Sequence, residues 1–392
     1  MSREPTPVDT IVVGAGISGL GCARRLYESG ERFVVISSNI GGRILQSADG
    51  AIPLGAFYVR ADYDHVNQIV TRGSRLRSRD TLRHDQDGAY TLWNHRLLTH
   101  PGQVVRFLLL LNRFRRHYNR LKTNSETRSQ AQAIRADPFL HQFYHEPATT
   151  TVTDHRFPDL ARHYLAPALH GTAFLPLDQL TGFTMLLGAL PTIVATYEFT
   201  LRWDALLHDL RPMLVTDTVT TITATDGGYT IGTTSGQRWI ARNVVVATDI
   251  TEAQRLLDIT HVKKPVQVHM FEIAGDLRPP FTAADVHLFA DDETTLAMVA
   301  RPNQPVLFCT QSPAPDLDRY FTRWDIIEHH DWNPAFNLAG DALLDCQQAP
   351  NLYLIGDHNI CGLEDAYLTG LYAANQITSR PQQLRPLSPP SS

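Results

Sequence analysis

The sequence predicts an α/β protein in which a Rossmann-like GxGxxG domain is interleaved with an α+β second domain. Near the N-terminus an apolar strand runs into a glycine-rich turn, a helix and a second strand. Strand patterns return at residues 206–248, after a long region of helical pattern. A buried strand at 352–355 and a helix at 364–378 close the chain. This alternation indicates two domains built from discontinuous segments.

Composition excludes several classes of protein. The chain has 392 residues, 43% of them hydrophobic and 19% charged, which is enough apolar material for a large core. No apolar run is long enough to span a membrane, and the first residues lack the apolar core of a secretory signal. The four cysteines show no CxxC spacing, so we expect neither a disulfide framework nor a metal site. A net charge of -5 argues against nucleic acid as a partner, and we expect a reducing, cytoplasmic setting.

The first β-α-β unit carries the strongest local pattern. Its strand is Asp9–Val13, and Gly14-Ala15-Gly16-Ile17-Ser18-Gly19 follows it directly. In such a unit the first glycine permits the tight turn, the second lets the backbone approach a pyrophosphate, and the third lets the helix pack closely. The N-terminus of the helical stretch at Leu20–Ser29 then offers free amides and a positive dipole end to phosphates.

The remaining elements are predicted from periodicity. Helical patterns lie near 101–121, 128–146 and 158–170, and a further helix is expected at 316–330. Residues 262–311 are predicted to form strands. The tail at 381–392, rich in proline and serine, is expected to be disordered.

Three motifs in order carry a resemblance to a known family. They are the glycine turn, Gly41-Gly42-Arg43 after the second strand, and Ile355-Gly356-Asp357 leading to the turn at Gly362 and the final helix. Between them, Val219–Ile222, Tyr229 and Asn243–Thr248 match a hairpin and return strand. Together these segments resemble the flavin amine oxidase superfamily over nearly the whole chain.

The resemblance implies an FAD-binding domain at 1–61, 205–255 and 341–380, and a substrate domain at 62–204 and 256–340. FAD is expected to be non-covalent, because the family's covalent thiol lies several residues earlier than Cys361 relative to the glutamate. The residues expected to contact FAD are Gly14, Gly16, Ile17, Ser18, Gly19, Ser37, Ser38, Gly41, Gly42, Arg43, Gly55, Ala56, Phe57, Val219, Ala247, Thr248, Gly356, Asp357, Leu363, Glu364 and Ala366.

Three departures from the family pattern bear on cofactor and reaction. Ser37 occupies the position where dinucleotide folds usually keep an acidic residue for the ribose, so an NADP-binding interpretation stays open. Many amine oxidases place a lysine near flavin N5, and here the aligned residue looks like His269. His269 is therefore the candidate catalytic base, and the alternative is a strand histidine that faces solvent or is hydrogen-bonded in the core. The family's aromatic cage also looks incomplete, because its position in the closing turn is Gly362.

The function implied by the resemblance is FAD-dependent oxidation, with a hydride passing from a substrate carbon to flavin N5. The substrate is expected to be a small or lipophilic organic molecule contacted by Tyr58, Trp332 and Phe336, and oxygen is a candidate electron acceptor. The alternatives are a non-redox flavoenzyme, such as an isomerase or mutase, and a flavin-binding protein without turnover. The arginine-rich apolar helix at 104–116 suggests contact with a membrane surface or a lipophilic entrance, with a solvated helix face as the simpler interpretation. The sequence does not indicate an oligomeric state.

Overall fold

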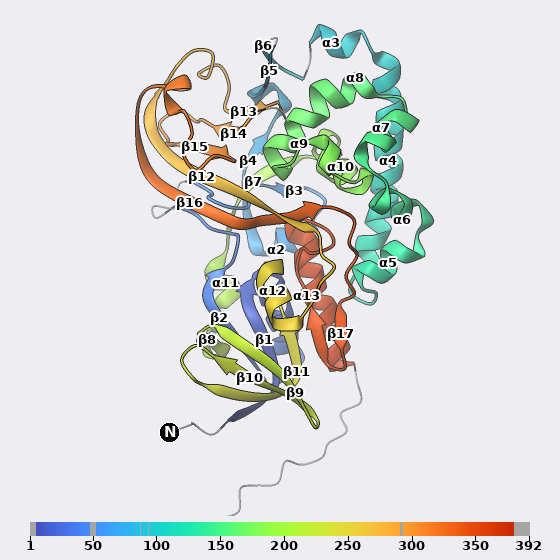
Figure 1. Cartoon of the computed structure of the whole chain (residues 1–392), viewed down its shortest axis with the longest axis vertical. Helices are drawn as coiled ribbons and strands as arrows, with labels where there is room; N and C mark the ends of the chain where they lie inside the picture. Colours follow the sequence, from blue (N-terminus) through green and yellow to red (C-terminus); the bar gives the residue numbers. More distant parts are fainter. Residues whose placement is uncertain (1–4, 48–51, 87, 93, 291–292, 380–392) are drawn as a thin grey trace, which may run out of the picture.

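The computed structural model describes residues 5–47, 52–86, 88–92, 94–290 and 293–379. Figure 1 shows an elongated molecule with one sheet at the bottom, a second sheet at the upper left and a helical layer at the upper right. The predicted tail at 381–392 lies outside the described residues.

The lower sheet has the predicted Rossmann-like centre. Its strand order is β17-β18-β11-β1-β2-β8, with β10 and β9 continuing from β11 as an antiparallel hairpin. Strands β8, β2, β1, β11 and β18 run parallel to one another, whereas the edge strand β17 is antiparallel to β18. The strands are β1 (Thr6–Gly16), β2 (Phe33–Gly41), β8 (Leu214–Thr216), β9 (Val219–Thr225), β10 (Gly228–Thr233), β11 (Arg238–Val246), β17 (Gln347–Ala349) and β18 (Leu352–Leu354).

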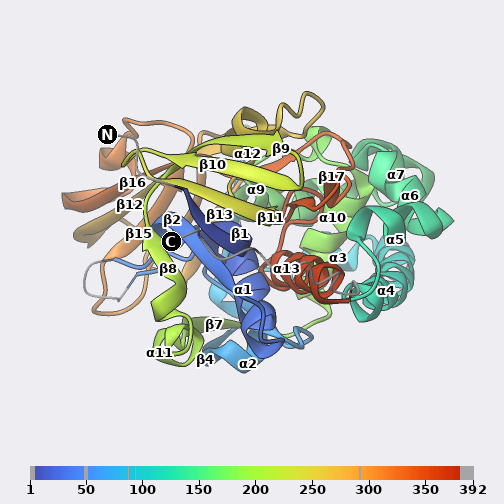
Figure 2. The ribbon, with the colours of Figure 1, turned by 90° about the horizontal axis from the view of Figure 1, so that it is seen from below.

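Two apolar layers cover this sheet because its parallel strands are buried on both faces. Val12 and Val35 face a core shared with α1 (Ile17–Glu28) and α13 (Leu363–Thr378). Ile11 and Val13 face the other core, under β9, β10 and α12 (Ile250–Leu257). Helices α1 and α13 lie side by side (Figure 2), so the first and last helices of the chain pack together.

A small sheet packs beside the first of these cores. It has the order β3-β7-β4, from β3 (Val59–Arg60), β4 (Val70–Leu76) and β7 (Thr196–Leu201). Val70 and Leu201 belong to the same core as α1, as do residues of α2 (Val66–Ile69) and α11 (Trp203–Leu207). Segments that the sequence assigned to the substrate domain thus contact the nucleotide-binding domain, and the domain boundaries stay a prediction.

The upper sheet has the order β16-β12-β15-β14-β13-β5-β6. Its strands are β5 (Thr81–Asp85), β6 (Gly88–Tyr90), β12 (Lys264–Leu277), β13 (Val286–Phe289), β14 (Thr295–Val299), β15 (Val306–Thr310) and β16 (Phe321–Ala339). Val268 and Met270 point from β12 into the large core under the helices, whereas Phe271 and Ile273 point to the opposite face. The sheet therefore separates a helix-covered face from a loop-covered face.

The helical layer comprises α3 (His95–Leu98), α4 (Pro101–Asn124), α5 (Gln130–Ala136), α6 (Pro138–His145), α7 (Ala148–Asp154), α8 (Pro158–Leu160), α9 (Ala166–Ala173) and α10 (Gly182–Ala189). A π-helical turn, Ala161–Leu165, joins α8 to α9. The predicted helix at 128–146 is divided at Asp137, whose carboxylate caps α6 before Pro138. The helix predicted at 316–330 is wrong, because residues from Phe321 onwards form the long edge strand β16.

Candidate functional site

The glycine turn forms a cradle at the end of β1. Gly14 has φ +105°, and a Cβ there would lie 2.8 Å from the carbonyl oxygen of Ala247. A Cβ at Gly19 would lie 2.0 Å from the Gly14 oxygen, so α1 packs directly on the turn. A Cβ at Gly16, in contrast, would meet nothing within 4 Å, so this residue borders open space. No acidic residue or side-chain cap occupies the first turn of α1, which leaves the amides near Ile17 and Ser18 available to an anion.

The residues after β2 pack against this cradle. The Ser37 hydroxyl accepts a hydrogen bond from the Ala15 amide at 3.0 Å and donates to the Asn39 carbonyl at 2.6 Å. The hydroxyl proton of Ser37 is therefore used in a hydrogen bond to the backbone. The neighbouring Ser38 is exposed. A Cβ at Gly42 would lie 3.2 Å from the Gly16 Cα atom. The Gly41-Gly42 turn and the first glycine turn therefore form one continuous surface.

Arg43 ties this surface to the closing motif. Its Nη2 donates to Asp357 Oδ1 at 2.5 Å, and its Nη1 donates to the Ala335 carbonyl at 2.7 Å. Burial works to raise the pKa of Asp357, but the charge of Arg43 and its hydrogen bond hold that pKa below its usual value. Three segments distant in sequence, those of Arg43, Ala335 and Asp357, therefore meet at this guanidinium.

The segment after Arg43 lies beside β16. The Ala56 amide donates to the Arg43 carbonyl at 3.0 Å, and the Trp332 indole donates to the Leu54 carbonyl at 2.6 Å. Gly55 fits tightly, because a Cβ there would lie 2.2 Å from the Arg43 oxygen. Trp332 thus lies next to the predicted cofactor loop.

The other aromatic residues predicted at the substrate side are spread over two neighbourhoods. Phe57 and Tyr58 stack edge to face with ring centroids 5.3 Å apart, and burial raises the pKa of Tyr58. Phe336 stacks instead on Phe174, at the end of α9, with centroids 5.3 Å apart. The structure therefore places Phe336 against the helical layer.

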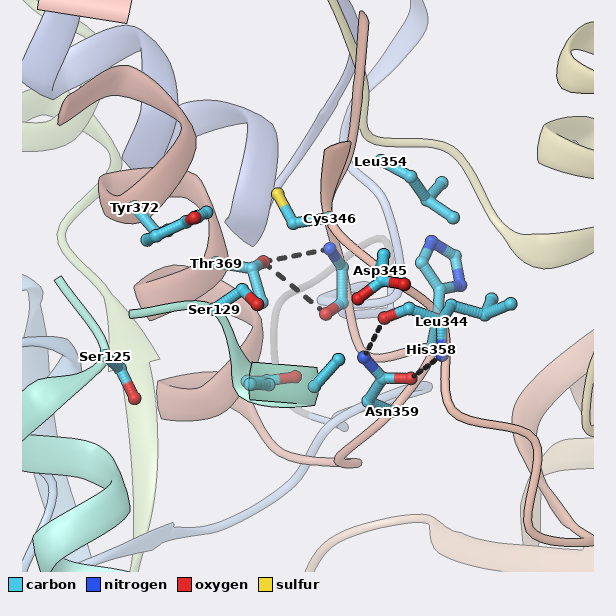
Figure 3. Close-up of a pocket in the computed structure, with 13 residues that line it drawn as sticks. Ser125, Ser129, Leu344, Asp345, Cys346, Leu354, His358, Asn359, Thr369 and Tyr372 are labelled. Atoms are coloured by element: carbon cyan, nitrogen blue, oxygen red, sulfur yellow. Dashed lines mark hydrogen bonds between the residues drawn. The ribbon is translucent and has the colours of Figure 1, made fainter. Parts of the chain in front are cut away.

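The closing turn is held by two polar side chains, which Figure 3 shows. Thr369 of α13 accepts a hydrogen bond from the Gly356 amide at 2.9 Å. Asn359 bonds both the amide and the carbonyl of Leu344, at 2.8 and 2.7 Å. A small pocket lies beside the turn and is lined in part by Ser125 and Ser129 of the helical layer.

The first turn of α13 is anchored by buried carboxylates. Glu364 accepts hydrogen bonds from the amides of Asp64, His65 and Val66, and so fixes the loop before α2. The Ala366 amide already donates a hydrogen bond to the Gly362 carbonyl. The amides of Leu363 and Glu364 are therefore better placed than that of Ala366 to bind a ligand. Glu364 and Ala366 stay predicted cofactor contacts, with a structural role now shown for each.

Asp365, also in this turn, was not singled out from the sequence. Both its carboxylate oxygens accept from the Tyr118 hydroxyl, at 2.9 and 2.7 Å. Burial raises the pKa of Asp365 to about 6, although Tyr118 and the charges of Arg60 and Lys122 oppose the rise. This buried pair fixes α13 against α4.

The predicted adenine-side residues flank the same cradle. The Ala247 amide donates to the Val13 carbonyl at 2.8 Å, and the Thr248 hydroxyl donates to the Asp249 carbonyl at 3.1 Å. Val219 is buried at the start of β9, where Arg255 binds its carbonyl oxygen at 3.0 Å.

Lys263 lies at the closing turn, where the sequence did not place it. Its Nζ donates to the Asn359 carbonyl at 2.7 Å and lies 4.5 Å from the centre of the Tyr144 ring. The side chain is 3% exposed, and burial lowers its pKa to about 8, with Cys361 and Asp357 acting in the opposite direction. The sequence signal for Lys263 was its rarity, since the chain has only three lysines. Position alone suggested an ordinary loop residue before a strand.

His269 has different surroundings. Its Nδ1 lies 3.2 Å from His329 Nε2 and 3.6 Å from Asp331 Oδ1, both on the neighbouring strand β16. His269 shares a sheet face with Phe271 and Ile273, opposite the face that carries Val268 and Met270. The structure therefore groups His269 with β16 side chains, and its catalytic role stays a prediction.

Two properties of the described residues bear on other functions. None of the described helices is both long and apolar enough to cross a membrane. Within the same residues, no cluster of three or more histidine, cysteine, aspartate or glutamate side chains could hold a metal ion.

Comparison with known proteins matches the glycine-cradle region to a family described as an NAD(P)-binding Rossmann-like domain, over residues 12–72. Comparison with curated proteins gives no match.

Solved structures match over almost the whole chain. Putrescine oxidase bound to putrescine superposes with a TM-score of 0.70 at 13% identity, covering 96% of this chain and 100% of that one. Cyclohexylamine oxidase from Brevibacterium oxydans gives 0.65 at 14% identity, covering 95% and 98%. A fatty acid isomerase from P. acnes that produces CLA gives 0.69 at 14% identity, also covering 95% and 98%. The resemblance predicted from the motifs is confirmed at the level of the fold.

Proposed function

We propose that this protein is an FAD-dependent oxidoreductase that removes a hydride from a carbon atom of an organic substrate. The observation that carries the proposal is the meeting of two of the motifs at one guanidinium, which also binds β16. Arg43 follows the glycine cradle, binds Asp357 of the closing turn and binds Ala335 of β16. In open α/β sheets, ligands bind at this carboxyl end of the strands.

The residues present fit a dinucleotide such as FAD. The open space beside Gly16 and the uncapped N-terminus of α1 suit a diphosphate. Arg43 would add charge-assisted bonds to the phosphates, and Asp357 would accept from a hydroxyl of the cofactor. Bound FAD would supply the hydride acceptor, and the chain's own groups would position the substrate and move protons.

Lys263 is the group best placed to move a proton in this site. A lysine with a pKa near 8 is neutral in a substantial fraction of molecules at physiological pH and can accept a proton. Its bond to Asn359 holds it beside the closing turn, close to the charges of Asp357 and Arg43. We therefore propose Lys263 as the active-site base, with His269 as the competing candidate.

We also propose the domain division that the resemblance implies. The nucleotide-binding domain comprises 1–61, 205–255 and 341–380, and the substrate domain 62–204 and 256–340. The substrate would lie between the closing turn and the residues near Trp332 and Tyr58.

Absorbance spectroscopy of the purified protein tests the cofactor assignment, because bound FAD should give the absorption bands of a flavin. Anaerobic mixing with amines, porphyrinogens, polyenes and fatty acids should then bleach those bands with at least one class. A protein with no bound flavin and no affinity for added FAD would contradict the proposal. Bound flavin that no class bleaches would favour a binding role without turnover.

Isomerisation is a second candidate, favoured by the structural match to a fatty acid isomerase over 95% of this chain. The two functions differ in stoichiometry. An oxidoreductase consumes one equivalent of acceptor, or forms peroxide with oxygen, for each product molecule. An isomerase forms its product without consuming an acceptor and without forming peroxide.

A further inference from the structure

Helix α4 presents an outward face that the fold leaves uncovered. Its inner face packs into the large core through residues spaced three or four positions apart, namely Phe107, Leu111, Phe114 and Tyr118. The opposite face has the same spacing, and its exposed residues are Val105, Leu109, Asn112, Arg113, Arg116 and Arg120. Figure 1 shows α4 on the side of the helical layer that faces away from the upper sheet.

The N-terminal end of this outward face is apolar. Val105 and Leu109 are 56% and 66% exposed. Leu98 ends α3, and only Thr99 and His100 separate it from the start of α4. Leu98 is 75% exposed. Single apolar residues are ordinary on a protein surface, whereas a group of them marks an interaction site.

The C-terminal part of the same face is cationic. Residues 88–125 contain six arginines, one lysine and no aspartate or glutamate, although the whole chain has a net charge of -5. Within the part of the chain that the structure describes, Arg113, Arg116 and Arg120 form no ion pair. Arg113 lies 4.5 Å from the centre of the Phe139 ring, a contact that leaves its positive charge uncompensated.

Carboxylates on elements that pack against α4 have other partners. Asp137 caps α6 and binds His117 at 2.6 Å. Asp159 of α8 accepts a hydrogen bond from Gln103 at 2.6 Å. The outward arginines are therefore free to attract an anionic surface.

We propose that the outward face of α4, together with Leu98, docks on the surface of a bilayer that contains anionic lipids. The apolar side chains would enter the boundary between headgroups and acyl chains, and the arginines would bind lipid phosphates. A helix of 24 residues is about 36 Å long and straight enough for both parts of the face to meet one surface. An anionic bilayer matches both parts, whereas nucleic acid would leave the leucines in water. This contact is independent of the cofactor and of the reaction.

Flotation of the purified full chain with lipid vesicles tests the proposal. Vesicles with about 30% phosphatidylglycerol in phosphatidylcholine should bind wild-type protein roughly tenfold or more tightly than phosphatidylcholine alone, and added salt should weaken the binding. Arg113→Gln/Arg116→Gln should bind about 25-fold more weakly, because each arginine at an anionic surface contributes about five-fold. The matched control, Arg211→Gln/Arg323→Gln, removes the same charge from exposed arginines on other elements and should bind like wild type.

Leu98→Gln/Leu109→Gln tests the apolar part without a change of charge. This variant should bind anionic vesicles about tenfold more weakly, since two leucines lose their contact with acyl chains. All the substituted residues are exposed, so the thermal midpoints of the variants should match that of wild type. Equal wild-type affinity for the two kinds of vesicle, unchanged affinity in either folded α4 variant, or tighter binding to duplex DNA than to anionic vesicles would overturn the proposal.

Discussion

Lys263 and His269 lie six positions apart in sequence and face different parts of the molecule. Lys263 donates to the closing turn, and His269 contacts His329 on β16. Lys263→Met should retain flavin but slow flavin reduction or reoxidation by at least tenfold, since general acid–base assistance contributes about 10²–10⁴-fold. Wild-type rates should rise as pH passes about 8, where Lys263 loses its proton, and the variant should lack this rise.

His269→Ala is the paired measurement in the same stopped-flow assay. If His269 is a structural residue, this variant should react within a few-fold of wild type. A tenfold loss in His269→Ala, together with a normal Lys263→Met, would return the catalytic role to the histidine, and His269→Lys should then restore part of the rate.

Ser37 bridges the cradle to the end of β2 through Ala15 and Asn39. In Ser37→Glu, a carboxylate could still accept from the Ala15 amide and would add a charged acceptor for a ribose hydroxyl. A charge-assisted hydrogen bond contributes about 1.5–3 kcal/mol, so FAD affinity in a fluorescence titration should rise about tenfold or more. Weaker binding would mean that the serine's bond to Asn39 matters more than a ribose contact.

Cys361 is the thiol nearest the closing turn, and its chemistry bears on covalent attachment. Burial and the nearby charge of Asp357 raise its pKa well above the usual value, so the thiol stays protonated and weakly nucleophilic near neutral pH. Acid precipitation should therefore release all flavin colour into the supernatant. Colour retained in the washed pellet would show a covalent bond.

At the scale of elements, α13 depends on close packing against α1. A Cβ at Gly370 would lie 2.2 Å from the Ser18 carbonyl oxygen and 2.7 Å from the Cys22 amide. Gly370→Ala should therefore force the helices apart, lower the free energy of unfolding by about 1–3 kcal/mol and weaken FAD binding. Denaturant unfolding and FAD titration measure the two effects.

Gly102→Ala is the control for that substitution. A Cβ at Gly102 would meet only the side chain of Arg106, at 3.5 Å, which is ordinary contact. Because alanine is the better helix former, this variant should be as stable as wild type or slightly more stable. Equal stability of both variants would mean that α1 and α13 can move apart without lowering the free energy of unfolding.

Elements held by local signals were predictable from sequence, and β16 shows where those signals fail. The glycine spacing before α1 acts on the nearby backbone, so it was read from the chain, whereas the cap at Asp137, also a local signal, was missed inside the helix predicted at 128–146. Residues 321–330 mix apolar and charged positions at a helical spacing, yet pairing with β12 determines their structure. Trp324, Ile326 and Ile327 favour a strand, which in retrospect was the available signal.

The same distinction holds within the candidate site. The motif glycines and Arg43 could be predicted because their spacing encodes backbone geometry. Lys263 could not, since its significance lies in burial beside Asn359, which only the tertiary structure creates.

At the scale of the whole molecule, the proposed cofactor site joins segments from both ends of the chain. Arg43 links β2 to the closing turn and to β16, and Gly370 packs α13 on the helix that follows the cradle. A ligand bound across these segments should stabilise the fold as one unit. Addition of FAD to protein stripped of flavin should therefore raise the midpoint of thermal unfolding. Unfolding should remain a single transition at every FAD concentration.

The expected size follows from mass action. A ligand at one hundred times its dissociation constant, bound only to the folded state, adds about 2.7 kcal/mol. Differential scanning calorimetry should show the midpoint rising with FAD concentration, while NADP at the same concentrations leaves it unchanged. Since Ser37 leaves no acidic group at this position to repel a 2′-phosphate, NADP is the critical comparison. An equal or larger shift with NADP would assign the cradle to that nucleotide and remove the basis for a flavin-dependent reaction.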